Sequence, residues 1–347
     1  MSQAATFLLT GFNRSGGVRI LTEVINLLAD NGWQVTVLTD ARYGAPFYPL
    51  HARVKSVQLT SKSRLKYLID LAVYRYEAVF IVSSNYRTSL ALGVAQLFRR
   101  TGGARIFQLL QHYDPLQFGM LDYRLPFWMR WIHSLIIRIA FYLPHEQIAV
   151  SQWIINKIGL KRVKLISNGI NAHVFNAKGS LGRQYAKKLK VGVNLRKNPL
   201  KCWDETNEVL ANLSVMDGIE VRAMGDAPLM DIPYVYPKND QEIADFYKGC
   251  DVFVFLSLAE GFGLPPLEAM ACGCVVVLND AGGTREFAID QKNAVLVPLD
   301  PSRVIFEIQQ LLANQDRFES LRQAAILTGQ SFSDILMKQR YLDYFNS

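Results

Sequence analysis

Residues 255–279 read FLSLAEGFGLPPLEAMACGCVVVLN, a stretch that joins two apolar runs through a short polar turn. The runs DVFVFLS and CVVVLN are typical of strands that are buried on both faces of a parallel sheet. Pro265 and Pro266 suit the first turn of a helix, where a missing amide hydrogen leaves no partner unsatisfied, and Gly273 suits its end. The stretch therefore predicts a strand, a turn, a helix over 266–272 and a second strand.

The polar turn carries two glutamates, Glu260 and Glu268, with seven residues between them. Each carboxylate oxygen accepts two hydrogen bonds, so carboxylates hold sugar hydroxyls well. Backbone amides at the N-terminus of a helix bind anions such as phosphate, and glycines let a ligand approach the backbone closely. The amides expected to be free are those of Gly261, Phe262, Gly263 and Leu264. A diphosphate on these amides and hydroxyls on both carboxylates describe a nucleotide sugar.

The same alternation of short apolar runs and helical segments fills the whole chain. The first half contains ATFLLTG, QVTVLTD, AVFIVSS, RIFQLLQ and QIAVS, and the second half contains KLKVGVNL, EVRAMG, DVFVFLS, CVVVLN and NAVLVP. Such runs, separated by helices, predict an α/β protein with two doubly wound domains, 1–170 and 171–330. A cleft between two such domains would hold a ligand. The C-terminal helix, 331–347, either packs back on the first domain or caps the second.

Composition limits the partners that the chain can have. The 347 residues carry 38 Lys and Arg against 30 Asp and Glu, which gives a net charge of +8 and favours anionic ligands. No block of five or more basic residues occurs, so nucleic acid is not an expected partner. The four cysteines form no Cys-x-x-Cys pair and no His cluster accompanies them, so a metal site is not expected either.

Two segments bear on the location of the protein. MSQAATFLLTG has no positively charged segment before its apolar run, which argues against a signal peptide. The longest apolar run, WIHSLIIRIAFYL, is too short to span a membrane and contains Arg138. The segment around it, YRLPFWMRWIHSLIIRIAFYLPH, mixes large aromatics with arginines, which suits a helix lying on an anionic membrane. The alternative is a core-covering helix with its basic residues in water. A cytoplasmic protein is expected, peripheral at the inner face of the membrane under the first alternative.

EGFGLPPLE resembles the Glu-x7-Glu signature of the retaining glycosyltransferases of family 4, which have the GT-B fold: two Rossmann-like doubly wound domains facing across a cleft. The resemblance extends through AMACGCVVVLNDAGGTREF and reaches upstream to GFNRSGGVRILTEVINLLADNGWQVTVLTD and VSQWIINKIGLKRVKLISNGINAHVF. It implies a retaining enzyme that moves a hexose or deoxyhexose from a nucleotide-diphosphate sugar to a glycan or lipid-linked acceptor, in surface polysaccharide or glycoconjugate synthesis. No Asp-x-Asp occurs in the chain, so no metal is expected, and the nucleotide sugar is a co-substrate.

The resemblance implies roles for the residues of the turn. Glu268 would hold the ribose of the donor, and Glu260 would lie beside the transferred sugar. The amides of residues 261–263 would take hydroxyls of that sugar, and those of Leu264 and its neighbour would take the phosphate.

The resemblance also implies cations on the loop NLRKNPLKCWDE. Lys201 would neutralise the leaving diphosphate, although Cys202 stands where the family usually has a glycine. Arg196 and Lys197 are both candidates for a companion cation. A second departure follows the turn: the family's Asp-Gly-x-x-Gly is replaced by DQKNA, which begins at Asp290.

In the first domain the resemblance implies two contacts with the donor. Gly16 and Gly17 would let the first loop lie against the diphosphate. His112, at the end of RIFQLLQ, would contact the transferred sugar. If the Asp-Pro pair at 114–115 sets the register instead, Tyr113 takes that place.

Three functions other than a sugar transferase are alternatives, and each would need its own sequence or activity feature. A nicotinamide-dependent dehydrogenase lacks support because no Gly-x-Gly-x-x-Gly occurs. A GT-B-shaped nucleotide-sugar epimerase would form product without an acceptor. A silent glycosyltransferase-like partner subunit would have no need of both Glu260 and Glu268.

Overall fold

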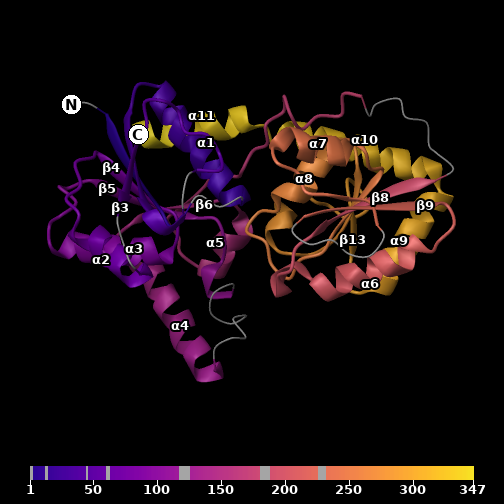
Figure 1. The fold of residues 1–347 in the computed structure, drawn as a ribbon, viewed down its shortest axis with the longest axis horizontal. Helices are drawn as coiled ribbons and strands as arrows, with labels where there is room; N and C mark the ends of the chain where they lie inside the picture. The colour runs from indigo at the N-terminus through magenta and orange to yellow at the C-terminus, as the bar shows by residue number, and fades with distance from the viewer. Residues whose placement is uncertain are drawn as a thin grey trace. The chain divides into compact units, whose positions relative to one another are not determined.

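The computed structural model describes residues 3–11, 15–43, 46–59, 63–116, 126–179, 188–225 and 232–347 (Figure 1). The chain divides into two compact units. Met1–Ser167 and Lys338–Ser347 form the N-terminal unit, and Asn168–Met337 forms the C-terminal unit. Each unit has its own parallel sheet and its own core.

The N-terminal unit is built on a parallel sheet whose strand order, over the described residues, is β3-β2-β1-β4-β5-β6-β7. The strands are β1 (Ala4–Leu9), β2 (Gln34–Asp40), β3 (Lys55–Leu59), β4 (Phe80–Ser83), β5 (Arg105–Leu110), β6 (Glu146–Ala149) and β7 (Val163–Leu165). The helices are α1 (Gly16–Asp30), α2 (Arg64–Val73), α3 (Tyr86–Leu97), α4 (Phe127–Ile139) and α5 (Gln152–Ile158), with 3-10 turns η1 (Ala41–Tyr43) and η3 (Ala140–Tyr142).

Alternate side chains of these strands enter two cores, one on each face of the sheet. On one face Leu8 packs with residues of α2 and α3. On the other face Phe80 lies edge-on to Phe107, with ring centroids 5.5 Å apart. Phe345 stacks on Phe80 with centroids 4.5 Å apart, and Phe345 belongs to α11 (Asp334–Asn346). The last helix of the chain therefore fills the second core of the N-terminal unit.

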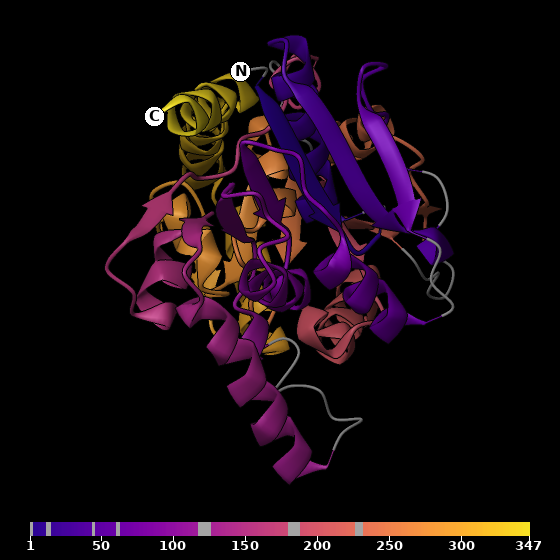
Figure 2. The same ribbon diagram turned by 90° about the vertical axis from the view of Figure 1, so that its left-hand side faces the viewer.

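Helix α4 is the exception to this packing, because Figures 1 and 2 both show it projecting from the body of the N-terminal unit. Within the described parts of the chain, no helix combines the length and the apolar character needed to cross a membrane.

The C-terminal unit repeats the design with the strand order β10-β9-β8-β11-β12-β13 over the described residues. The strands are β8 (Leu189–Leu195), β9 (Ile219–Gly225), β10 (Tyr234–Val235), β11 (Val252–Phe255), β12 (Val275–Asn279) and β13 (Val295–Val297). The helices are α6 (Trp203–Ser214), α7 (Asp240–Lys248), α8 (Leu264–Ala271), α9 (Pro301–Ala313) and α10 (Gln315–Ser331), with 3-10 turns η4 (Pro199–Lys201) and η5 (Gly283–Glu286).

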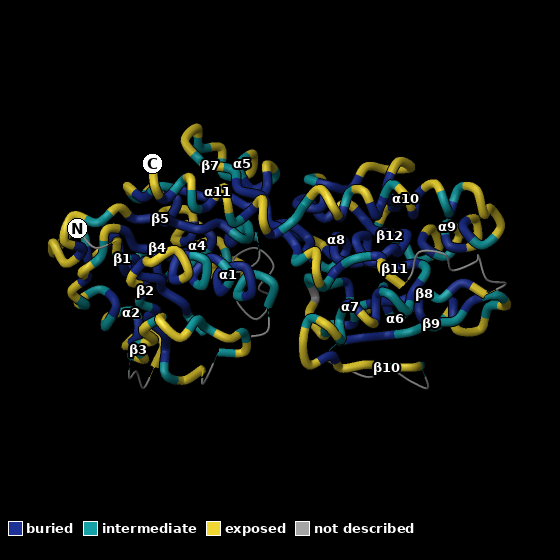
Figure 3. The backbone as a smooth tube through the Cα atoms, turned by 90° about the horizontal axis from the view of Figure 1, so that it is seen from above, coloured by how far each residue is buried: buried dark blue, intermediate teal, exposed yellow. Residues whose placement is uncertain are grey.

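Strands β11 and β12 lie at the centre of this unit, and every residue of both is buried (Figure 3). Helix α8 between them is also buried, apart from a half-buried Pro265. A Cβ on Gly329 of α10 would lie 2.6 Å from the Cα of Ala271, so α10 packs directly on the backbone of α8. The segment that carries the polar turn therefore lies between two buried strands, β11 and β12, and its helix α8 is packed against α10.

Strands β3, β7 and β10 were not among the runs predicted as strands. β3 and β10 are the outermost strands of their sheets, and β7 is the outermost strand beside β6. None of the three has a residue that is fully buried. An edge strand pairs on one side only and needs no apolar run, so apolar patterning does not reveal it.

Candidate active site

The C-terminal sheet reverses its strand order between β8 and β11, which are hydrogen-bonded neighbours. Ligands of doubly wound sheets bind at the carboxyl ends of the strands at such a point. The loops that follow these two strands meet there. The backbone N–H of Leu258 and the hydroxyl of Ser257 both donate to the carbonyl oxygen of Leu200, each at 2.9 Å. The loop that carries Lys201 is therefore fixed against the segment that carries Glu260.

Lys201 and Glu260 form an ion pair between Nζ and Oε1. The Lys201 side chain is 20% exposed and the Glu260 side chain is 8% exposed, so water screens this pair less than a surface pair. Removal of either partner would leave the other charge unbalanced in a largely desolvated place. The sequence-predicted Lys201 and Glu260 are thus brought together by the fold, with a cation and a carboxylate side by side at the strand ends.

The polar turn after β11 lies directly on the turn after β12. The N–H of Glu260 donates to the carbonyl of Ala281 at 2.8 Å, and the N–H of Gly283 donates to the carbonyl of Glu260 at 3.0 Å. A Cβ on Gly283 would lie 2.3 Å from the carbonyl carbon and oxygen of Gly261 and 2.6 Å from the nitrogen of Phe262. Only a residue without a side chain fits there, so the two backbones hold each other in place.

Helix α8 begins at the end of this turn without a side-chain cap. Its N-cap is Gly263, which has φ +96°, a left-handed conformation that favours glycine, and no side chain to accept a bond from the first amides. Pro265 and Pro266 follow at the start of the helix and have no N–H. The amide donors of this helix end are therefore those of Leu264 and of the turn before it, and their role towards phosphate stays a prediction.

Glu268 lies at the fifth residue of α8, and only 3% of it is exposed. Side chains on a helix lean towards its N-terminus, which here is the turn at 261–263. Glu260 and Glu268 are thus carried by the two segments that flank the same turn. That both acids meet one ligand stays a prediction.

Cys202 and Gln291 stand where the family pattern has glycine, and both have a left-handed backbone, with φ +48° and +55°. This conformation costs a residue with a side chain about 1–2 kcal/mol. Cys202 is the N-cap of α6 and is buried, and burial raises the pKa of its thiol to about 12. The thiol therefore stays protonated and is no nucleophile at neutral pH.

Arg196 and Lys197 follow β8, and over the described residues neither pairs with an acid. Their roles stay predictions. A residue that the sequence reasoning missed is Asn279, the last residue of β12. Its side chain accepts from the N–H of Ser257 and donates to the carbonyl of Ser257, each at 2.9 Å. The sequence signal that could have revealed Asn279 is an amide side chain at the end of an otherwise apolar strand. The Asn279 side chain fixes the carboxyl end of β11, where the turn begins.

The loop after β12 carries one more ion pair that the sequence reasoning did not anticipate. Arg285 Nε donates to Asp280 Oδ1 at 2.9 Å. This bond lowers the pKa of the Asp280 carboxyl, and burial opposes it in part. The pair is largely exposed, so its contribution to stability is small.

The N-terminal unit places its predicted residues at the carboxyl edge of its own sheet. The side chain of Gln111 donates to the carbonyl of Gly17 at 2.8 Å, which joins the end of β5 to the start of α1, where Gly16 is the first residue. Tyr113 packs against the rings of Phe141 and Trp153. His112 beside it is half-buried as well, and which of the two meets a ligand stays a prediction.

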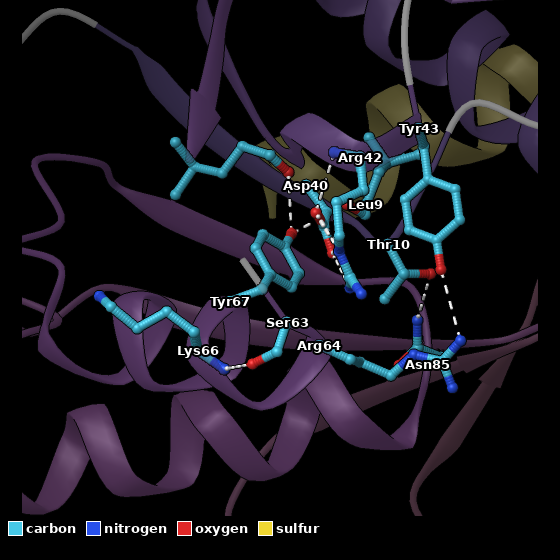
Figure 4. A network of polar contacts seen from close by, with 11 residues as sticks. Leu9, Thr10, Asp40, Arg42, Tyr43, Ser63, Arg64, Lys66, Tyr67 and Asn85 are labelled. Atoms are coloured by element: carbon cyan, nitrogen blue, oxygen red, sulfur yellow. Dashed lines mark hydrogen bonds and ion pairs between the residues drawn. The ribbon is translucent and has the colours of Figure 1, made fainter. Parts of the chain in front are cut away.

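Figure 4 shows a polar network at the carboxyl ends of β1 and β2. Arg42 Nε donates to both carboxylate oxygens of Asp40, at 3.0 and 3.1 Å, where β2 ends. The hydroxyl of Tyr67 donates to the carbonyl of Leu9 at 2.8 Å. The network fixes the ends of β1 and β2 and has a cationic side chain, but no residue predicted from the motifs lies in it.

Within the described residues, no three His, Cys, Asp or Glu side chains form a group of the kind that holds a metal ion. The groups that the site does offer to a ligand are the Lys201 cation, the buried carboxylates of Glu260 and Glu268, and the backbone amides at the N-terminus of α8. These groups suit a ligand that has both negative charge and hydroxyls.

Comparison with known proteins gives the site its context. Residues 232–328 match the family model for "Glycosyl transferases group 1", a range that contains the turn and both acids but not Lys201. The serotype-specific mannosyltransferase WbdA of Escherichia coli is 33% identical over 95 residues, which are 27% of this chain and 12% of that protein. The uncharacterized glycosyltransferase MJ1178 of Methanocaldococcus jannaschii is 29% identical over 196 residues, 54% of each chain. The chain thus spans about half the length of the archaeal relative and far less of WbdA.

Solved structures extend the likeness to the whole chain. Sucrose-phosphate synthase from Thermosynechococcus elongatus has a TM-score of 0.80 at 16% identity, over 99% of this chain and 98% of that one. HepE from Anabaena, in complex with UDP and glucose, has a TM-score of 0.74 at 18% identity, over 99% of each chain. The predicted fold class is confirmed: the chain has the GT-B fold, with two Rossmann-like parallel-sheet units, and its C-terminal unit is similar to the group 1 glycosyl transferases.

Proposed function

We propose that this protein is a retaining glycosyltransferase that moves a hexose or deoxyhexose from a nucleotide-diphosphate sugar to a glycan or lipid-linked acceptor. The observation that carries the proposal is the Lys201–Glu260 pair, which lies beside the uncapped start of α8 at the strand-order reversal. The likeness to a mannosyltransferase and to a structure bound to UDP and glucose supports a hexose donor. A role in surface polysaccharide or glycoconjugate synthesis agrees with the similarity to WbdA.

The donor would bind by its charge and by its hydroxyls. Lys201 and the amides of Gly263 and Leu264 would neutralise the diphosphate. Glu268 would accept from the ribose hydroxyls, and Glu260 from the hydroxyls of the transferred sugar. Since Lys201 is paired with Glu260 in the structure, donor binding would replace a carboxylate contact of the ammonium group by a phosphate contact.

In the transfer step that we propose, the acceptor hydroxyl oxygen bonds to the anomeric carbon on the face that the phosphate leaves. The bond between that carbon and the phosphate oxygen breaks, its electron pair stays on the phosphate, and the acceptor's proton passes to the same phosphate. The protein supplies position and charge neutralisation, which need no covalent intermediate and no metal. Full activity after exhaustive chelation is expected, and a strict Mn²⁺ requirement would contradict this part of the proposal.

The decisive experiment combines a donor screen with single variants. Thermal shift across UDP, GDP, ADP and dTDP identifies the base, and cleavage of the matching nucleotide sugars is then measured. Lys201→Ala is expected to lower kcat about 100- to 1000-fold, because it removes the cation that meets the developing charge on the leaving group. Lys292→Ala is the matched control, since this lysine is exposed on the loop before β13. Loss of activity in the control, or none in Lys201→Ala, would contradict the assignment.

Two further variants test the acids. Glu260→Gln is expected to lower turnover, because the carboxylate lies beside the reacting sugar. Glu268→Gln is expected mainly to raise KM for the donor, because it weakens a contact made equally before and during reaction. An epimerase would change the donor sugar without any acceptor, and a silent partner subunit would neither bind nor cleave any donor.

We further place the protein in the cytoplasm. The four cysteines are buried and form no disulfide with one another. Disulfides are rare in reducing compartments, so thiols of this kind agree with that environment.

A further inference from the structure

Helix α4 turns its apolar face outward. Its large apolar side chains recur at three- and four-residue spacing and are exposed rather than packed. Those that define the face are Phe127, Trp128, Trp131, Leu135, Ile136 and Ile139. Phe127 is 76% exposed, Trp128 62% and Trp131 66%. The sequence also allowed a helix that covers the core with its apolar side. Such a helix would bury these side chains, whereas in α4 they are exposed.

The opposite face of α4 is fixed to the N-terminal unit, so the helix cannot turn its apolar side inward by simple rotation. Ser134 and Ile137 are its buried residues. His133 Nε2 and the hydroxyl of Tyr86, at the start of α3, are hydrogen-bonded at 2.8 Å. The two rings also meet edge to face with centroids 5.8 Å apart. The polar contact is inside and the apolar surface is outside, the reverse of an ordinary surface helix.

The shape and the charge of α4 agree with a bilayer surface. The helix has 13 residues and is about 20 Å long, too short to cross a hydrocarbon core. It projects from the body of its unit in both views (Figures 1 and 2). Residues 126–145 contain no Asp or Glu, and of the two arginines of α4 Arg138 is exposed and Arg130 is half-buried. Exposed tryptophans beside a positive charge, with no acid nearby, are the composition of a helix that lies in the interface of an anionic membrane.

We infer that α4 docks the protein on an anionic membrane, with the Trp128 and Trp131 side inserted at the headgroup level. A second copy of the chain would also cover an apolar face. Two copies would bring the positive charges of Arg138 together with no acid on α4 to balance them, whereas anionic lipid supplies the opposite charge. The inference adds a surface to the proposed function without depending on sugar transfer.

The test is flotation with two kinds of vesicle, one of phosphatidylcholine alone and one of phosphatidylcholine mixed with phosphatidylglycerol. The full chain is expected to float with the anionic vesicles only. Trp128→Ser/Trp131→Ser is expected to abolish flotation, and Arg138→Gln to weaken partitioning about fivefold. Added salt is expected to weaken binding of the wild type. Tryptophan emission should shift to the blue on anionic vesicles.

Val215→Ser/Leu327→Ser is the control, because both side chains are exposed apolar residues of the C-terminal unit. It should float like the wild type. Equal flotation on neutral vesicles, or none on either kind, would overturn the inference. So would a dimer of the wild type that the tryptophan double variant dissolves, since the face would then be an interface between copies. Far-UV circular dichroism shows that each variant is folded. No donor is present, so failure here and failure of the proposed transfer are separate results.

Discussion

Replacement of Gly283 by alanine is expected to displace the donor-binding turn without touching a charged residue. The new Cβ would lie 2.3 Å from the carbonyl carbon and oxygen of Gly261, where ordinary contacts lie at 3.4–4 Å. Both sides of this contact are backbone, so neither can give way by a change of rotamer, and the two turns must separate by about 1 Å. A misplacement of about 1 Å in a catalytic site costs roughly 100-fold in rate. Overpacking of this kind also costs about 1–3 kcal/mol of stability.

The assay is kcat/KM for cleavage of the donor, measured with the free energy of unfolding in urea. Gly283→Ala should remain folded and lose about 100-fold in kcat/KM. Gly93→Ala in α3 is the matched control. Its Cβ would lie 3.1 Å from the end of the flexible Leu143 side chain, and alanine favours a helix more than glycine does. A folded Gly283→Ala variant with the wild-type kcat/KM would refute the reasoning that these two turns build the site.

Three other changes have expected outcomes of their own. Gln291→Gly should raise the free energy of unfolding by about 0.5–1 kcal/mol, because it relieves a left-handed residue; a lower value in urea unfolding would contradict this. Burial raises the pKa of Asp114 to about 7, so between about pH 4 and pH 7 the folded state keeps a proton that the unfolded state releases. The free energy of unfolding should therefore fall as pH rises through that window, and Asp114→Asn should remove this fall; an unchanged pH dependence would count against it. Phe345→Ala should cost about 3–5 kcal/mol, because it empties the core between α11 and the N-terminal sheet, and a loss below 1 kcal/mol would show that α11 is not part of that core.

The buried centre of each sheet was predictable because its strands are apolar throughout. Every residue of VFVF in β11 and of VVVLN in β12 is buried, and such runs are typical of parallel strands whose two faces are both covered by helices. The edge strands β3, β7 and β10 could not be found in this way, since half-exposed residues carry no apolar pattern.

Candidate site residues could be proposed from the sequence where they act through their side-chain type, but not where they act through their backbone. Glu260 was proposed from its place beside the polar turn and Lys201 from the resemblance to a glycosyltransferase family, and the fold pairs them. That the chain tolerates Cys202 and Gln291 where the family has glycine was not predictable, because only the structure shows that both keep the glycine-like conformation. Which side of α4 faces water was also open, since an apolar stripe has the same period whether it points in or out.

The central claim is that a bare backbone turn, with an acid on each side of it, grips an activated sugar. The most direct measurement is a crystal structure with the nucleoside diphosphate that most raises the melting temperature. Phosphate oxygens are expected at hydrogen-bond distance, about 3 Å, from the amide of Leu264 and from Lys201 Nζ, with the ribose hydroxyls on Glu268. A nucleotide bound away from α8, or phosphates on the turn while the Glu268 carboxylate points away from the ribose, would contradict it.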